Sequence, residues 1–146
     1  MANALYGKAR EEFLSQNPAL DWDTDTIKVF LVDNGYVPVI DTHQFLSSIL
    51  AANRHGNAGG QTRADAPTIG GKSVTLGVAD GGDVTITLVP AGPAIQYIVI
   101  FKDDGVADAS SPLIAFIDIA TGLPVTPNGG DITIQWDNGG NKIFKL

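Results

Sequence analysis

The sequence predicts a mostly β protein: an antiparallel β-sandwich or barrel-like domain of about seven strands, with one or two short helices on its N-terminal side. Two observations lead to this prediction. Apolar and polar residues alternate in short runs, which is the period of a half-buried strand. Glycine, asparagine and aspartate separate these runs at intervals of roughly 10 residues. No apolar run approaches the ~18 residues of a membrane-spanning helix, so we expect no membrane contact.

The composition of the 146-residue chain is that of one acidic domain, residues 1–146. The net charge of −7 argues against nucleic acid as a partner, because phosphate backbones repel acidic surfaces. The absence of cysteine excludes disulfides, thiol catalysis and zinc–thiolate sites. Few charged residues and 17 glycines suggest that part of the surface is covered in an assembly. The N-terminus lacks the apolar stretch of a signal peptide, so we expect a protein made and kept in a reducing cytosol or in a particle assembled there.

Two short helices are expected in the first third of the chain. Residues 4–15 carry apolar side chains at helical spacing, with Asn3 as the expected cap. Asn17-Pro18 should end this helix, since the residue before a proline avoids the helical region. A second helix is expected over residues 42–52, with Thr42 as its cap.

The predicted strands are short apolar runs bounded by turn residues, and they cover residues 26–32, 74–78, 84–88, 95–101, 113–119, 132–136 and 142–146. Asn34-Gly35 should form a turn after the first of them. The tight link 79–82 predicts that the second and third runs pair as a hairpin. The fourth run is almost continuously apolar, which is typical of a central strand buried on both faces.

Residues 53–72 form the least regular segment, a flexible loop with no apolar period. It carries Arg54 and Arg63, two of the three arginines. The residues leave two interpretations open: a mobile surface loop, or an arm that contacts a neighbouring molecule.

Two short motifs resemble ligand sites but depart from them. Asp21, Asp23 and Asp25 have the spacing that begins a calcium loop, but the glycine and the glutamate that complete it are missing, so we expect an acidic turn before the first strand. Gly70-Gly71-Lys72-Ser73 imitates the end of a phosphate-binding loop. It precedes a predicted strand rather than a helix, so we expect a glycine hinge there.

Candidate catalytic side chains are few. His43 lies near Asp41, but no serine has the context of a nucleophile, and His55 falls in the polar loop. Asp103-Asp104, and Asp80 with Asp83, are acidic pairs of the kind that glycosidases use, although turns favour aspartate for structural reasons. Trp22 and Trp136 lie far apart in sequence, and the second should point inward from its strand. We therefore predict no catalytic, cofactor-binding or metal-binding residues and no enzyme activity. A cell-wall or capsule hydrolase is kept as a third hypothesis beside the two given below.

Three stretches of the chain carry a resemblance to a known family. The first is MANALYGKAREEFL at 1–14, followed by Trp22 and DTIKV at 25–29. The second is GVAD at 77–80 with DVT at 83–85. The third and most specific is ATGLPVTPNGGDI at 120–132, followed by QWDNG at 135–139 and IFKL at 143–146. Together they resemble a family of small virion structural proteins of tailed bacteriophages, and the resemblance is weakest over residues 53–73.

The resemblance implies a structural protein of the virion, assembled in the host cytoplasm, and no catalytic motif. The leading hypothesis is a capsid decoration, or cement, protein. Its partners would be the major capsid protein and further copies of itself, by analogy a trimer. The second hypothesis is a binding module of the tail, neck or fibre of the same virion. The first contacts expected are the loop 120–130 and the N-terminal helix.

Overall fold

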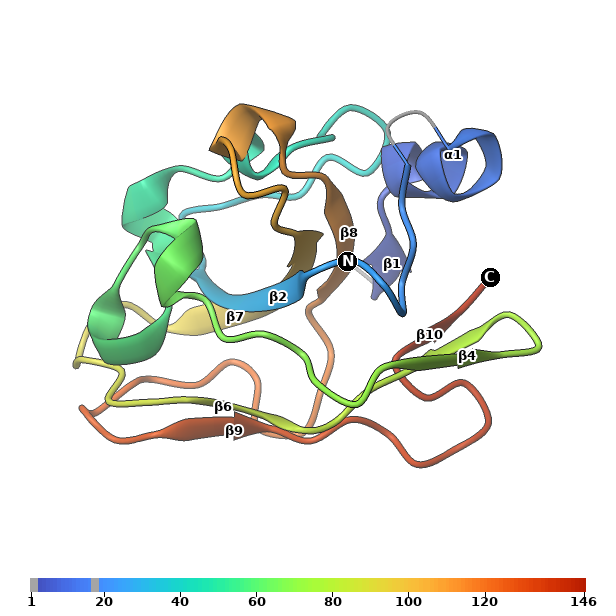
Figure 1. Ribbon diagram of the computed structural model, residues 1–146. Helices are drawn as coiled ribbons and strands as arrows, with labels where there is room; N and C mark the ends of the chain where they lie inside the picture. The colour runs from blue at the N-terminus through green and yellow to red at the C-terminus, as the bar shows by residue number, and fades with distance from the viewer. Residues whose placement is uncertain (1–2, 17–18) are drawn as a thin grey trace.

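A computed structural model describes residues 3–16 and 19–146, and it is a mostly β protein with an N-terminal α-helix (Figure 1). Its ten strands form three antiparallel sheets, so the predicted mostly β class is confirmed. None of the sheets in the described part closes into a barrel. The strands outnumber the seven expected because one predicted run divides into two strands and two further strands contain only two residues each.

The largest sheet has the order β1-β8-β7-β2-β3. Its members are β1 (Ala4–Leu5), β8 (Leu113–Ile117), β7 (Ile95–Lys102), β2 (Ile27–Asp33) and β3 (Arg54–His55). The predicted central strand is confirmed, because β7 lies between β8 and β2 and most of its side chains are buried. The Asn34-Gly35 turn is also confirmed, with the Gly35 N–H donating to the Asp33 carboxylate at 2.8 Å.

The hairpin predicted between residues 74–78 and 84–88 is wrong. The first run itself folds back, so that β4 (Ser73–Thr75) pairs with β5 (Val78–Asp80), and β5 pairs on its other side with β10 (Phe144–Lys145). Leu76 and Gly77 allow this turn by taking positive φ angles of 52° and 79°. The second run, β6 (Val84–Ile86), pairs instead with β9 (Ile132–Ile134).

The N-terminal helix α1 (Gly7–Ser15) begins later than the 4–15 helix predicted, because Ala4 and Leu5 pair with β8 as a strand. Asn3 does not cap it. The Asn3 side chain donates to the Ile119 carbonyl oxygen at 2.9 Å and accepts the N–H groups of residues 118 and 119. Asn17-Pro18, the expected end of the helix, lies outside the described residues.

The second helix predicted over 42–52 is wrong as well. The chain there makes only two 3₁₀ turns, Leu46–Ser48 and Ala51–Asn53. Its backbone pairs elsewhere: the Leu46 N–H donates to the Ser111 carbonyl at 2.9 Å, and the Leu113 N–H donates to the Gln44 carbonyl at 2.8 Å. The segment therefore has the apolar pattern of a helix, but its backbone hydrogen-bonds to residues 111–113 around the start of β8 instead.

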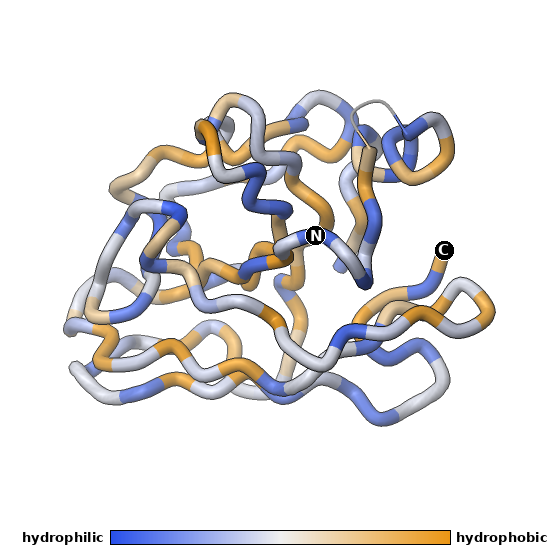
Figure 2. Tube along the Cα trace, viewed as in Figure 1, coloured by the Kyte–Doolittle hydropathy of each residue, from blue (hydrophilic) through white to orange (hydrophobic). Residues whose placement is uncertain are grey.

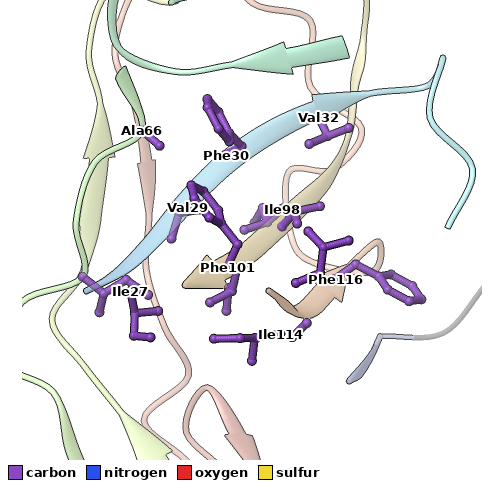
Figure 3. Close-up of a cluster of buried hydrophobic side chains, with 14 of the residues drawn as sticks. Ile27, Val29, Phe30, Val32, Ala66, Ile98, Phe101, Ile114 and Phe116 are labelled. Carbon is purple, nitrogen blue, oxygen red and sulfur yellow. The ribbon is translucent and has the colours of Figure 1, made fainter. Parts of the chain in front are cut away.

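The hydrophobic core lies on the large sheet, and the β6–β9 pair forms a second layer beneath it (Figure 1). Figure 3 shows side chains of β2, β7 and β8 meeting in this core. The rings of Phe30 and Phe101 stack there with centroids 5.4 Å apart. Within the described ranges, no helix has the length and apolar character needed to cross a membrane.

Candidate interaction surface

The two motifs that resemble ligand sites serve the fold. Asp21–Asp25 forms the expected acidic turn before β2, in which the Asp21 N–H donates to the Asp25 carboxylate at 2.9 Å. That carboxylate also pairs with Lys102 at 2.9 Å. The glycines 70–71 lead directly into β4, as expected, and the Lys72 ammonium donates to the Asp25 carbonyl oxygen.

His43 belongs to a buried chain of hydroxyl groups. Its Nδ1 atom lies 2.8 Å from the Tyr36 hydroxyl oxygen, which lies 2.8 Å from the hydroxyl of the fully buried Tyr6. Burial lowers the pKa of His43 and raises that of Tyr36 to about 12. His55 lies elsewhere, with its Nε2 atom 2.9 Å from the Asp33 carboxylate. The structure thus joins His43 to tyrosines rather than to Asp41.

The sequence leaves residues 53–72 open as a mobile surface loop or a contact arm, and in the structure both arginines of this irregular segment are engaged with the body of the protein. Arg54 is buried and pairs with Asp108 at 2.6 Å. Arg63 pairs with Asp103 at 2.8 Å and Asp104 at 3.3 Å. The acidic partners lie about forty or more positions away in sequence, so no local pattern could show that these arginines point inward.

The acidic pairs and the tryptophans that were weighed as glycosidase features also hold the structure together. The Trp22 indole N–H donates to the Asp80 carbonyl oxygen, and the Trp136 indole N–H donates to the Gly82 carbonyl oxygen, each at 2.9 Å. Both rings are buried, as expected for Trp136. Asp83 accepts the Trp136 backbone N–H at 3.0 Å. In the described part of the chain, no three histidine or carboxylate side chains are placed to hold a metal ion.

The small sheet β10-β5-β4 projects from the body of the protein beside the C-terminus (Figure 1). Its register places Val74, Ala79 and Phe144 in one row across the three strands. At its tip, Leu76 is 92% exposed and Leu146 is 57% exposed. The Leu146 N–H donates to the Gly77 carbonyl at 2.9 Å, which ties the C-terminus to the turn. Figure 2 shows apolar residues along this projecting hairpin.

Aromatic side chains pack against Phe144, one of the three residues of this row. The Phe144 ring lies edge-on to the Trp22 ring with centroids 5.0 Å apart, and 6.0 Å from the ring of Phe13 in α1. Together with Leu20 they line an apolar pocket of ≈ 260 Å³ that opens beside Val74. We call this surface (Phe13, Leu20, Trp22, Val74, Phe144 and Leu146), together with Leu76 at the tip of the hairpin, the hairpin patch. Leu76 itself lines the pocket on the opposite face of the small sheet, with Thr75 and Val78. A projecting apolar patch on a supported sheet is suited to contact with another protein.

The sequence did not single out the hairpin patch, because residues 74–78 fit an uninterrupted strand. The two segments expected from the sequence to make the first contacts, the N-terminal helix and the loop 120–130, occupy different places in the structure. Helix α1 contributes Phe13 to the patch. In the loop 120–130, Val125 exchanges two backbone hydrogen bonds with Ile95 of β7. Comparison with models of known protein families gives no match to this chain, and comparison with curated proteins gives none.

Proposed function

We propose that this protein is a structural component of a tailed-phage virion, a capsid decoration protein that binds the outside of the major capsid protein lattice and stabilises the head. The observation that carries the proposal is the hairpin patch, in which Leu76 and Leu146 project into solvent. Burying such side chains against a neighbour is favourable by roughly 25 cal/mol per Å². The resemblance of the sequence to virion structural proteins supplies the class of partner.

The rest of the structure suits a cement protein. The carboxylates and tryptophans that were weighed as enzyme features are engaged within the fold, as in the pairing of Arg63 with Asp103 and Asp104. Hydrogen bonds and aromatic contacts fix the patch from beneath, so little conformational entropy remains to be lost when it docks. Further copies of the chain, as a trimer, would place several such patches on the lattice at once.

The experiment is to measure the copy number of the protein in purified virions against the major capsid protein by quantitative mass spectrometry. We expect a ratio near one or near a simple fraction of it. Particles lacking the protein should lose their DNA at a lower temperature. A few copies per particle would instead place the protein in the tail, neck or fibre. Unchanged heat stability after its removal would contradict the clamping role.

A further inference from the structure

A second surface, a groove distinct from the hairpin patch, lies between the large sheet and the projecting sheet. It has a volume of ≈ 490 Å³ and is lined on one side by Ala4 and Leu5 of β1 and on the other by Ile143, Phe144 and Lys145. Buried Phe116 of β8 contributes to its floor. Phe144 separates this groove from the pocket under the hairpin patch, because it lines both.

Two strand edges open onto the groove. β1 is the last strand of the five-stranded sheet, and β10 is the last strand of the three-stranded sheet. Each of them pairs with a single neighbour, β8 and β5 respectively. A strand edge offers backbone donors and acceptors to an added chain, and this is a common way in which proteins bind extended peptides.

The charged side chains that line the groove are positive, although the protein as a whole is acidic. The chain has nine lysines and arginines and a net charge of −7. Within the described ranges, Arg10 and Lys145 are the two of these cations that make no ion pair or hydrogen bond through the side chain. Both line this groove. The other seven are engaged: Lys8, Lys28, Arg54, Arg63, Lys72, Lys102 and Lys142.

We propose that this groove binds an extended acidic segment of another protein. One apolar side chain of the segment packs on Leu5 and Ile143, and its carboxylates pair with Arg10 and Lys145. The acidic segments of this chain itself do not fit that description. The turn at residues 21–25 folds back on itself with Trp22 buried, and Asp103-Asp104 is held by Arg63. The inference stands independently of the proposed function, because it rests on the chemistry of the groove alone.

The test is a titration of the ¹⁵N-labelled protein with a heptapeptide of alternating aspartate and valine, followed by NMR. The control probe is the same peptide with lysine in place of aspartate. We expect saturable shifts of the backbone amides of Leu5, Phe116 and Lys145 with the acidic probe only. The double substitution Arg10→Glu and Lys145→Glu should weaken binding by about tenfold, because it reverses two exposed charges that line the groove.

Lys8→Glu is the matched control. It makes the same charge change as Arg10→Glu alone, on the same helix but outside the groove, so it is compared with that single variant. It should leave peptide affinity close to that of the wild type. Spectra of the free variants show whether they are folded, and Lys145→Glu alone serves if the double variant is not. Absence of binding, shifts elsewhere, or equal binding of the lysine probe would overturn the proposal. Concentration-dependent self-association with shifts at the groove would also overturn it, since the occupant would then be a second copy.

Discussion

The Tyr36 hydroxyl lies 2.8 Å from Nδ1 of His43, and the N–H of Val39 donates to the same nitrogen at 3.3 Å. Because a backbone N–H can only donate, this nitrogen carries no proton, and Tyr36 donates to it. The Tyr36 oxygen then accepts from Tyr6. The chain of hydroxyls therefore joins the start of α1 to residues 36–43 and requires a neutral His43.

We predict that this arrangement makes the protein less stable as the pH falls below about 6.5, the usual pKa of histidine. Burial lowers the pKa of His43, so the unfolded chain takes up the proton first. Stability contributed by neutral His43 is present above that pH and is lost as the pH falls toward the lowered pKa. Urea unfolding at pH 7.5 and 5.5 measures the loss. His43→Gln should make it smaller, whereas His55→Gln should retain the His43 contribution. An equal loss in His43→Gln and the wild type would refute the assignment.

Glu12 is predicted to destabilise the protein at neutral pH. It is 2% exposed, and while its Oε1 accepts from Gln44 at 2.9 Å, its Oε2 has no hydrogen-bond partner among the described residues. Burial raises the pKa of Glu12, so stability falls as the pH rises through the range between the unfolded and the folded pKa. Glu12→Gln should raise the free energy of unfolding by about 1 kcal/mol at pH 7.

The gain from Glu12→Gln should vanish near pH 4, where the unfolded carboxyl is largely protonated as well. Glu11→Gln, one position earlier on the exposed face of α1, should change stability by less than about 0.5 kcal/mol. Chemical denaturation of both variants at the two pH values checks this. A loss of stability in Glu12→Gln at pH 7 would show that the carboxylate is satisfied in solution.

Arg63 is predicted to contribute more to stability than its place in an irregular segment indicates. It pairs with Asp103, Asp104 and Asp108 at 2.8, 3.3 and 3.2 Å. Arg63→Ala should cost about 1–2 kcal/mol, because it removes the cation of Asp104 and one of the two cations at Asp103 and at Asp108. Arg10→Ala, which removes an unpaired arginine, should cost less than about 0.5 kcal/mol. Similar losses for the two variants would mean that the ion-pair cluster adds nothing.

The ion-pair cluster around Arg63 is predicted to contribute less to stability in acid. Burial alone would raise the pKa of Asp104, but hydrogen bonds from Ser110, Ser111 and the backbone N–H groups of Val106 and Ala107 hold it well below its usual range. Stability from this carboxylate is therefore full above about pH 3.9 and is lost as the pH falls below it. Asp104→Asn should flatten the acid limb of the stability curve. An acid limb as steep as that of the wild type would contradict this role.

The two tryptophans are predicted to restrain the same short link between β5 and β6. Trp136→Phe removes the donor to the Gly82 carbonyl and should cost about 1–3 kcal/mol, and Trp22→Phe should cost a similar amount through Asp80. The double variant should cost less than the sum, because both hydrogen bonds restrain one short segment. Urea unfolding of the four proteins gives the coupling. Strict additivity would show two independent contacts.

The sequence was sufficient for features that follow from local pattern. The apolar run at 95–101 and the turn at 34–35 needed only side-chain period and turn chemistry. It was insufficient where the structure of a segment depends on residues that are distant in the sequence. The run 74–78 alternates like one strand, and only the left-handed turn at Leu76 and Gly77 divides it. Residues 42–52 have a helical apolar stripe, but their backbone pairs with residues 111–113.

The two candidate surfaces, the hairpin patch and the groove, could not be predicted from the sequence for the same reason. The hairpin patch depends on Phe144 meeting Trp22 from the other end of the chain, and the groove depends on β1 and β10 standing opposite each other. Local alternation does not reveal such pairings. The arginines of the 53–72 segment are visible in the sequence, but their acidic partners are not, so the sequence alone does not distinguish an inward-facing cluster from a surface loop or a contact arm.

The most direct test of the central claim is binding of the purified protein to heads that lack it, compared between Leu76→Asp and Leu88→Asp. Both leucines are largely exposed, at 92% and 62%, and both have positive φ, but only Leu76 belongs to the hairpin patch. We predict that the wild type and Leu88→Asp bind the heads and that Leu76→Asp loses at least about tenfold in affinity while keeping its melting temperature. Undiminished binding of folded Leu76→Asp would contradict the claim that this patch holds the protein on the capsid.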